Sequence, residues 1–499
     1  MFFFSFDTQR KWASGVRGAS SRVLKSHLME FTHLINGRSE SSATFFDVIN
    51  PATGKVFAQS PNASRAQLDT AVAAAREAFP AWKSLSFEQR RGILKRFGQA
   101  FKERVNDLIP LLVREQGKPL AAAQIELSYT PFQIEKLCAL EVPTEILRDN
   151  AQGRVELRYR PLGVVGIITP WNVPVSIAVG RITQALYTGN TAIQKPSPYT
   201  PLTTLKMGEI ARDILPAGVL NILAGDDNLG PWITEHSGID KISFTGSVAT
   251  GKKVLASASS NLKRVTLELG GNDAAIVLDD VDPAKVASRI FWAAFANCGQ
   301  ICVAIKRLYV HDSIYEPFCQ ALTAIARSVK VGDGFEPNVE IGPIQNRMQY
   351  EKVLGFLEDT KKIGARILTG GHALDGPGYF IAPTIVADIQ EGSRLVDEEP
   401  FGPILPVIRY DNVEDAIRRA NSTRYGLGGS VWTNDLKRGA EIAARLEAGT
   451  TWVNQHNLPD PHVPFGGAKE SGLGREYSSL GLKSYMEAQV INIPVSIKA

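Results

Sequence analysis

The 499-residue sequence has few cysteines, no charge excess beyond its first residues and no long uninterrupted apolar run. Four cysteines are too few for a disulfide scaffold and suit a reducing compartment; they are Cys138, Cys298, Cys302 and Cys319. The formal net charge of +4 comes entirely from residues 1–28, where five basic residues stand against one acidic residue. Because the remaining chain is neutral and phosphate binding requires a concentrated basic surface, we expect no nucleic-acid partner.

The most apolar stretch, residues 164–180, is about as long as a short membrane span. Thr169-Pro170-Trp171-Asn172 interrupts this stretch and predicts a strand followed by a helix. We therefore expect no transmembrane segment and no membrane partner.

Residues 1–28 form a head that is rich in Arg, Ser and aromatic residues and poor in acids. This composition is typical of a mitochondrial transit peptide. The alternative is a disordered extension, because Met29 opens the first domain-like segment. We expect a cytoplasmic protein, with a mitochondrial location as the alternative.

Apolar residues make up 44% of the chain, as in soluble globular proteins, and the length suits roughly three domains at about 150 residues each. Residues 64–137 have helical periodicity. Short apolar runs then begin at 164, 191, 220, 241 and 264, separated by helical stretches at 175–188, 201–215, 228–236 and 248–258. Strands that alternate with helices in this way predict an α/β fold with a doubly wound parallel sheet of the dinucleotide-binding type.

A second α/β region follows. Its predicted elements are a helix at 283–297, a strand at 307–311, helices at 314–328 and 345–362, a strand at 428–433, a helix at 436–447 and a strand at 450–454. Residues 141–160 and 485–496 are short and strand-like, so they could pair with a partner chain as edge strands.

A glycine-containing turn, Gly246 to Lys252, follows a predicted strand and opens a helix. Small residues there let the backbone approach a phosphate, and the helix N-terminus supplies free N–H groups. The turn nearly matches a nucleotide-triphosphate P-loop, but Lys253 replaces the hydroxyl residue that would hold Mg²⁺. Simple packing is the other interpretation.

Three polar residues are candidates for chemistry. Cys302 lies in a turn whose backbone N–H groups could favour a thiolate, whereas Cys298 has no companion ligands, so we expect no metal site. Glu268 alternates with the apolar Val265 and Leu267, and it is either a half-exposed strand carboxylate or a general base. Asn172 is either the cap of the following helix or an oxyanion donor.

In combination, these residues resemble the aldehyde dehydrogenase superfamily. The matching motifs are TPWN with Asn172, IQKPSPYTP with Lys195, FTGS with Gly246, LELGG with Glu268, GQIC with Cys302, EEPFGP with Glu399 and Phe401, and PFGGAKESGLGRE at 464–476. The resemblance covers about residues 30–495. It implies an NAD(P)-binding domain over 29–140 and 161–270, a catalytic domain over 271–480, and an oligomerisation element over 141–160 and 481–499. A homodimer or homotetramer is therefore expected.

The resemblance also implies the role of each residue. Cys302 would attack a small-molecule aldehyde, Asn172 would hold the oxyanion of the thiohemiacetal, and Glu268 would activate the water that hydrolyses the thioester. The cofactor-binding residues would be Ile168, Thr169, Pro170, Trp171, Lys195, Gly225, Gly246, Ser247, Gly251, Leu269, Glu399 and Phe401.

One departure from the family pattern concerns the cofactor. Many NAD-preferring members carry a glutamate three residues after Lys195, and this chain has Pro198. Losing that carboxylate removes an acceptor for the adenosine ribose and a charge that would repel a 2′-phosphate. We expect NAD as the cofactor, with NADP also possible.

The substrate tunnel implied by the resemblance is apolar, which favours an aliphatic or aromatic aldehyde. Its lining would be Val175, Ile177, Ile301, Val303, Leu458 and Phe465. Arg181 is interpreted as structural rather than as a carboxylate anchor. Three rival hypotheses are an acylating enzyme that passes the thioester to coenzyme A, a P-loop NTPase, and a catalytically silent protein on the same fold.

Overall fold

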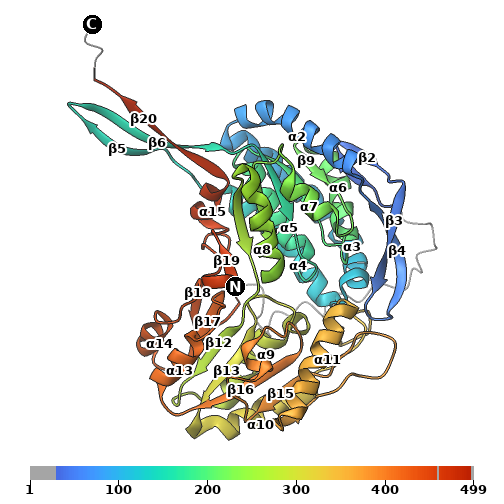
Figure 1. Ribbon diagram of the computed structural model, residues 1–499, viewed down its shortest axis with the longest axis vertical. Helices are drawn as coiled ribbons and strands as arrows, with labels where there is room; N and C mark the ends of the chain where they lie inside the picture. The colour runs from blue at the N-terminus through green and yellow to red at the C-terminus, as the bar shows by residue number, and fades with distance from the viewer. Residues whose placement is uncertain (1–29, 458–459, 496–499) are drawn as a thin grey trace.

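The computed structural model describes residues 30–457 and 460–495. The predicted head at 1–28, Leu458, and residues 496–499 of the predicted oligomerisation element lie outside these ranges. Figure 1 shows two α/β bodies packed against each other and a narrow arm that projects away from them. Among the described residues, no helix is long and apolar enough to cross a membrane.

The first body is built around an eight-stranded sheet. Five of its strands are parallel to one another: β7 (Val164–Ile168), β8 (Thr191–Lys195), β9 (Leu220–Ile222), β10 (Lys241–Thr245) and β11 (Arg264–Glu268). The helices between them are α5 (Pro174–Tyr187), α6 (Leu202–Arg212), α7 (Leu229–Glu235) and α8 (Val248–Ala258). The strand order β11-β10-β7-β8-β9 confirms the doubly wound α/β fold.

The antiparallel edges of this sheet are β1 (His33–Ile35) with β2 (Arg38–Glu40) on one side and β19 (Gly472–Leu473) on the other. A separate hairpin consists of β3 (Thr44–Asn50) and β4 (Lys55–Asn62). Because Leu473 pairs with Leu267 of β11, residues inside the predicted 271–480 segment return to the first sheet. The strand pairing therefore does not follow the predicted boundary at residue 480.

Three long helices occupy the region where helical periodicity was found: α2 (Arg65–Ser84), α3 (Phe87–Gln116) and α4 (Leu120–Cys138). Ser86 begins α3 with a capping box, in which its side chain accepts from Gln89 N and the Gln89 side chain accepts from Ser86 N. Gly117 ends α3 in the left-handed conformation, with φ 92°. This turn delivers the next residue, Lys118, toward the interior.

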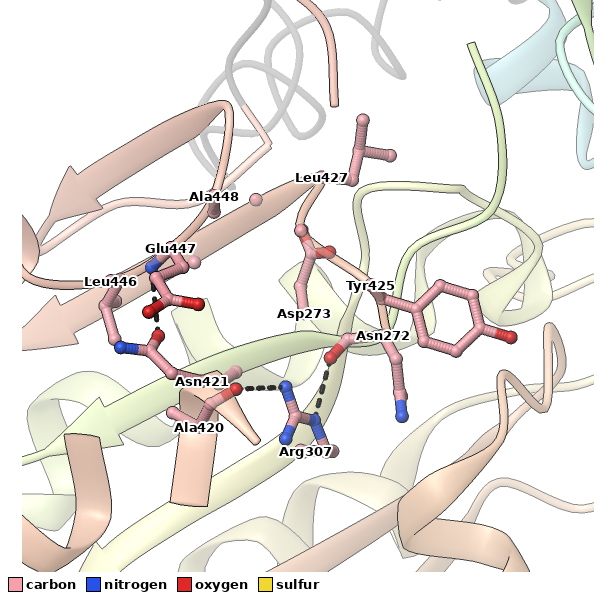
Figure 2. A pocket seen from close by; sticks show the side chains of 14 residues that line it. Asn272, Asp273, Arg307, Ala420, Asn421, Tyr425, Leu427, Leu446, Glu447 and Ala448 are labelled. Carbon is pink, nitrogen blue, oxygen red and sulfur yellow. Dashed lines mark hydrogen bonds between the residues drawn. The ribbon is translucent and has the colours of Figure 1, made fainter. Parts of the chain in front are cut away.

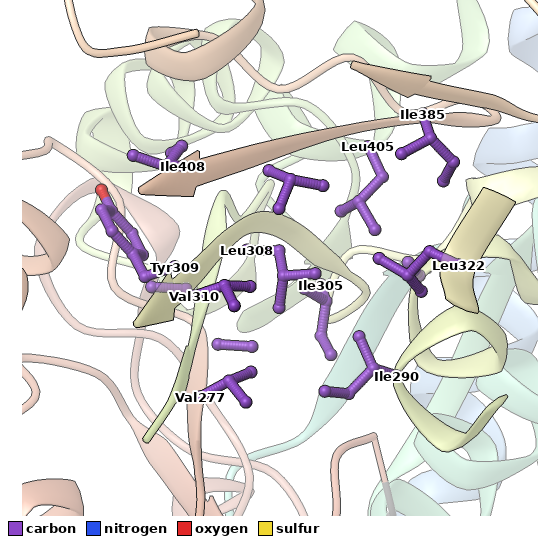
Figure 3. Packing of buried hydrophobic residues seen from close by; sticks show 14 of the residues in the cluster. Val277, Ile290, Ile305, Leu308, Tyr309, Val310, Leu322, Ile385, Leu405 and Ile408 are labelled. Atoms are coloured by element: carbon purple, nitrogen blue, oxygen red, sulfur yellow. The ribbon is translucent and has the colours of Figure 1, made fainter. Parts of the chain in front are cut away.

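The second body contains a seven-stranded sheet in the order β14-β15-β16-β13-β12-β17-β18. Its strands are β12 (Asp273–Val277), β13 (Ile305–His311), β14 (Arg366–Thr369), β15 (Thr384–Ala387), β16 (Ile404–Tyr410), β17 (Gly428–Trp432) and β18 (Thr450–Val453). The main helices are α9 (Pro283–Phe295), α10 (Tyr315–Ser328), α11 (Arg347–Lys362), α13 (Val413–Asn421) and α14 (Leu436–Ala443). In Figure 3, Leu308 of β13, Leu405 of β16 and Leu322 of α10 pack into one apolar core.

The arm is a three-stranded antiparallel sheet of β5 (Glu145–Asn150), β6 (Gly153–Pro161) and β20 (Met486–Ile493), with β6 in the middle. The strand-like segments at 141–160 and 485–496 thus pair with each other within one chain. Helix α15 (Ser478–Ser484) leads into β20. The arm projects from the body in Figure 1 and exposes apolar side chains, namely Ile146, Leu147, Val490 and Ile493.

Candidate active site

The candidate site lies where the carboxyl ends of β7 and β11 meet the turn before β13. Asn172 follows β7, and its Nδ2 donates to the Gln300 carbonyl at 2.9 Å. Gly271 follows β11, and a Cβ added to it would lie 2.6 Å from the Cys302 carbonyl. Chain segments that are distant in sequence therefore converge on Cys302.

Cys302 is partly exposed in a turn of unusual backbone geometry. Asn297 and Cys298, five and four positions before it, have φ of 54° and 60°. These angles lie in the left-handed region that non-glycine residues rarely adopt. Removal from water raises the pKa of the Cys302 thiol to about 12, and Lys306 opposes this shift. These surroundings therefore favour the neutral thiol over the thiolate that the turn position suggested.

Lys306 is a functional candidate that sequence reasoning missed. Its Nζ donates to the Ile301 carbonyl at 2.9 Å and to the Cys302 carbonyl at 2.6 Å. It also pairs with Glu399 at 3.2 Å. One buried ammonium thus joins a predicted cofactor ligand to residues 297–302, the turn that carries the predicted nucleophile and is called the nucleophile turn below. Only the position of this lysine, four residues after Cys302 in the sequence, could have signalled this role.

Asn172 is not a helix cap. The N-cap of α5 is Val173, which makes no side-chain capping bond, and the buried Asn172 amide instead contacts the Gln300 carbonyl. Asn297 Nδ2 donates to the Asn172 carbonyl at 2.9 Å. Both ends of Asn172 are thus attached to the nucleophile turn, which excludes the capping interpretation.

Glu268 is 3% exposed, so the half-exposed alternative is wrong. It ends β11, where it pairs in register with Gly472 of the antiparallel strand β19. Among the described residues, neither carboxylate oxygen has a hydrogen-bond partner. Burial raises the pKa of Glu268 to about 8, while the nearby Arg181 lowers it and Glu476 raises it.

Arg181 and Glu476 form a buried ion pair at 2.8 Å beside Glu268. Arg181 also donates to Thr245 Oγ1 at 3.3 Å, and Gln184 Nε2 donates to Glu476 Oε2 at 2.8 Å. These contacts agree with the structural interpretation of Arg181. Glu476 was not singled out from the sequence, because its partner lies almost 300 positions away in the chain.

The predicted cofactor residues lie along the carboxyl edge of the first sheet, except Glu399 and Phe401, which come from the second body. Ile168 ends β7, and Thr169 Oγ1 accepts from Gln194 Nε2 at 2.7 Å. After Pro170, the Trp171 ring meets Phe401 edge-on, with 5.4 Å between ring centroids. Trp171 and Phe401 therefore make an aromatic wall between the two bodies.

Lys195 supplies a test of whether these residues fit a nucleotide. Its buried ammonium makes one weak contact among the described residues, with the Pro196 carbonyl at 3.4 Å. Burial lowers the pKa of Lys195 to about 8, while Asp227 and Asp226 raise it. A buried ammonium that makes so few hydrogen bonds fits a ligand that brings hydroxyl or phosphate oxygens as acceptors.

The turn after β10 is suited to a phosphate. Gly246 N donates to the Glu268 carbonyl at 3.0 Å, and Ser247 caps α8 by accepting from Thr250 N. A Cβ on Gly251 would lie 2.5 Å from the Leu269 side chain, and one on Gly225 would lie 2.8 Å from Leu229. Glycine at these two positions is therefore required by packing against leucine side chains, which agrees with the packing interpretation.

Glu399 completes the set from the second body. It accepts from Gly271 N at 3.2 Å, and a Cβ on Gly270 would lie 2.2 Å from its Oε2. The predicted P-loop alternative fails nearby, because Lys252 is exposed on α8 and pairs with Glu470 at 2.9 Å. Its ammonium points to a surface carboxylate rather than into a phosphate cradle.

A polar pocket behind the nucleophile turn contains none of Cys302, Glu268 and Asn172 (Figure 2). Arg307 crosses it, donating to the Asn272 carbonyl at 2.8 Å and to the Ala420 carbonyl at 2.9 Å. Asp273, which also lines the pocket, lies 3.5 Å from His456, and His456 Nε2 contacts the Val303 carbonyl at 2.9 Å. Of these contacts, the one from His456 holds the backbone directly after Cys302.

Three of the predicted tunnel residues lie beside Cys302, and a fourth is enclosed in a core. Ile301, Val303 and Phe465 gather with Cys302 around Trp452 in a small apolar cluster. Val175, in contrast, is fully buried in the core of the first body, so it does not line an accessible tunnel.

A family model described as "Aldehyde dehydrogenase family" matches residues 38–491. The chain belongs to the aldehyde dehydrogenase family. Aldehyde dehydrogenase LUC3 from Fusarium sp is 37% identical over 468 residues, which are 93% of this chain and 99% of that protein. The NAD+ complex of an aldehyde dehydrogenase from Bacillus cereus has a TM-score of 0.89 at 35% identity, covering 94% of this chain and 97% of its own. A structure titled as an E. coli NADP dependent enzyme has a TM-score of 0.91 at 35% identity, covering 95% and 100%.

As an aldehyde dehydrogenase, the protein is an enzyme that oxidises an aldehyde to the carboxylic acid and uses NAD(P) as the hydride acceptor. The P-loop NTPase and the catalytically silent protein are therefore excluded. Among the described residues, no group of three or more His, Cys, Asp or Glu side chains is arranged to hold a metal ion.

Proposed function

We propose that Cys302, Asn172 and Glu268 perform hydrolytic aldehyde oxidation in this enzyme. The observation that carries the proposal is their convergence from separate elements: the Asn172 amide bonds to the turn that bears Cys302, and the Glu268 carboxylate acts electrostatically on the Cys302 thiol. Glu268 is among the groups that raise the pKa of that thiol, which supports a shared site.

In the proposed reaction, the Cys302 thiol loses its proton to solvent, its sulfur bonds to the aldehyde carbon, and the carbonyl oxygen becomes an oxyanion. The second N–H of the Asn172 amide and the Cys302 backbone N–H stabilise this oxyanion. As the carbonyl re-forms, the aldehyde C–H bond breaks and its hydride would pass to the nicotinamide cofactor, which leaves a thioester on Cys302. Glu268 then takes a proton from water, the water oxygen bonds to the thioester carbon, and the carbon–sulfur bond breaks to release the acid. A hydrolytic base argues against the acylating alternative.

The cofactor residues supported by the geometry are Lys195, Ser247, Glu399 and the Trp171–Phe401 wall. We propose NAD as the preferred cofactor and NADP as a weaker one. Pro198 offers no carboxylate to the adenosine ribose, but Asp226 and Asp227 raise the pKa of Lys195 and would repel a 2′-phosphate bound near its ammonium. Similar proteins have been solved both as an NAD+ complex and as an NADP dependent enzyme.

The substrate we propose is an aliphatic or aromatic aldehyde, because Ile301, Val303 and Phe465 surround Cys302 with apolar surface. We propose a homodimer or homotetramer held through the arm, whose exposed Leu147 and Val490 need a partner surface. For location we propose the cytoplasm, with mitochondrial import of the basic head at 1–28 as the alternative.

Two cysteines four positions apart test the assignment of the nucleophile. Cys302→Ser should abolish aldehyde oxidation while cofactor binding persists, because an unactivated hydroxyl is a far poorer nucleophile than a thiol. Cys298→Ser should retain most activity, since Cys298 is buried in the core of the second body. Activity is measured by reduced-cofactor absorbance and binding by fluorescence titration. Loss in Cys298→Ser with retention in Cys302→Ser would overturn the assignment.

A further inference from the structure

A buried ion pair lies directly behind the turn that carries Asn172. Lys118 follows the C-terminal turn of α3, and Glu126 lies on α4; the exposed fractions of their side chains are 4% and 3%. Lys118 Nζ bonds to Glu126 Oε2 and also donates to the Asn172 carbonyl at 3.2 Å. The ammonium therefore reaches from the α3–α4 connection to the backbone of the proposed oxyanion donor.

Glu126 holds the next residues of the same turn. Its Oε1 accepts from Val175 N at 2.9 Å and from Ser176 N at 3.2 Å, the first free N–H groups of α5. Because Val173 makes no side-chain capping bond, a carboxylate from another helix caps α5. Apart from the bond that joins the pair, every hydrogen bond described for these two side chains ends on residues 172–176.

The opposite side of Asn172 is fixed by the nucleophile turn. Asn297 Nδ2 donates to the Asn172 carbonyl at 2.9 Å, so that carbonyl accepts from donors on two sides. One N–H of the Asn172 amide bonds to the Gln300 carbonyl at 2.9 Å, and the amide group carries a second N–H. The direction of that second N–H depends on how the Asn172 backbone is held.

A buried ion pair is a poor device for stability alone, because desolvation of both charges offsets their attraction. Its geometry suits another task. We propose that Lys118 and Glu126 are positioning residues for the oxyanion hole, holding Asn172 so that its second amide N–H meets the oxygen that becomes negative on the substrate. This inference rests on the proposed role of Asn172. Preorganised donors are effective because no reorganisation is required when the charge develops.

The direct test is the rate of the first hydride transfer at saturating aldehyde and cofactor, measured by stopped-flow absorbance. Asn172→Ala should lower this rate by about 10²–10³-fold, as for other lost oxyanion donors. Lys118→Met should lower it by about 10–10²-fold, because misplacement by about 1 Å has effects of that size. The KM for the aldehyde should change less than the rate, since the lost interaction forms in the transition state.

A double-mutant cycle separates positioning from general damage. If Lys118 acts through Asn172, Lys118→Met should produce no further loss in the Asn172→Ala background. Alkylation of Cys302 by iodoacetamide should proceed at the wild-type rate in both variants, which a distorted site would not show. An equal loss from Lys118→Met in both backgrounds, or no loss in the folded single variant, would overturn the inference.

Glu115 provides a matched control for Glu126. It is also buried, and it caps α6 in the same manner, accepting from Leu202 N at 2.7 Å and Thr203 N at 2.9 Å. Glu126→Gln should slow hydride transfer, whereas Glu115→Gln should leave it unchanged at a comparable loss of melting temperature. Equal rates in the two variants would contradict positioning by Glu126. If Lys118→Met does not fold, Lys118→Arg and Glu126→Gln complete the same cycle.

The failure of this inference differs from the failure of the proposed function. If Asn172→Ala itself transfers hydride at the wild-type rate, Asn172 is not an oxyanion donor and both proposals fall. If Asn172→Ala is slow while Lys118→Met and Glu126→Gln are as fast as wild type, the proposed function stands and the positioning role is wrong.

Discussion

Burial changes the chemistry of Glu268 and Cys302 in the same direction. Removal from water raises the pKa of Glu268 to about 8 and that of the Cys302 thiol to about 12. A base works best when its pKa lies near the working pH, so the shift suits Glu268 to accepting a proton from water. The same shift leaves Cys302 protonated at rest, with Lys306 as the cation that favours its ionisation.

Glu268→Gln should still form up to one reduced cofactor per active site and then nearly stall as a thioester on Cys302. Glutamine keeps the shape but cannot take the proton, and general-base assistance is typically worth about 10²–10⁴-fold. In the wild type, Glu268 acts as a base only when deprotonated, so hydrolysis-limited turnover should rise with pH through about 8. The variant should lack this rise.

Stopped-flow absorbance and mass spectrometry of the acyl-enzyme check the prediction. Turnover of Glu268→Gln at the wild-type steady-state rate would make Glu268 a structural strand residue. Neither burst nor turnover, with cofactor binding intact, would instead favour a role in activating the Cys302 thiol.

At the scale of single elements, helix α8 presents its N-terminus at the carboxyl edge of the first sheet. Ser247→Ala should lower the stability by about 1 kcal/mol, because Ser247 caps α8 by accepting from Thr250 N. It should also weaken cofactor binding. Ser247→Asp is the informative control, since it retains a cap acceptor but adds a charge that repels a phosphate. Stability retained with cofactor affinity lost would separate the two roles; unchanged affinity would remove Ser247 from the phosphate site.

The turns after β8 and β9 should decide between NAD and NADP. Pro198→Glu should shift the preference toward NAD, because it adds a ribose acceptor and a charge that repels a 2′-phosphate. Asp227→Asn should shift it toward NADP, since Asp227 acts electrostatically on Lys195. Dissociation constants for both cofactors, measured by fluorescence, give the ratio. Ratios that stay constant in both variants would rule out these two turns as the determinant.

At the scale of the whole molecule, the projecting arm is the proposed oligomer contact. Val490 is 54% exposed on β20. Val490→Lys should convert the assembly to a smaller species, because burial of the lysine charge in an interface is unfavourable. Met348, 62% exposed on α11, is a matched apolar control, and Met348→Lys should leave the assembly size unchanged. Light scattering after size-exclusion chromatography measures both. Equal behaviour of the two variants would argue against the arm.

Local patterns in the sequence account for much of the first body. The five parallel strands begin at or beside the residues where apolar runs start, and α8 occupies the predicted 248–258. The elements between 364 and 421, in contrast, were not predicted. Strand β16 begins with an uninterrupted apolar run at 404–408 rather than with alternation, so periodicity alone does not separate it from a buried helix.

By itself, the sequence determined the fold class, the family and the identity of Cys302, Asn172 and Glu268 as candidates, because strand–helix alternation and motif spacing are local properties of the chain. Only the tertiary structure decided that Asn172 is not a cap, since its amide partner Gln300 lies 128 positions away. The Glu268 carboxylate is likewise enclosed by distant residues: a Cβ added to Gly466, almost 200 positions later, would lie 2.9 Å from its Oε1. The contributions of Lys118, Glu126 and Lys306 were hidden for the same reason: a charged side chain gains its role from the residues that surround it after folding.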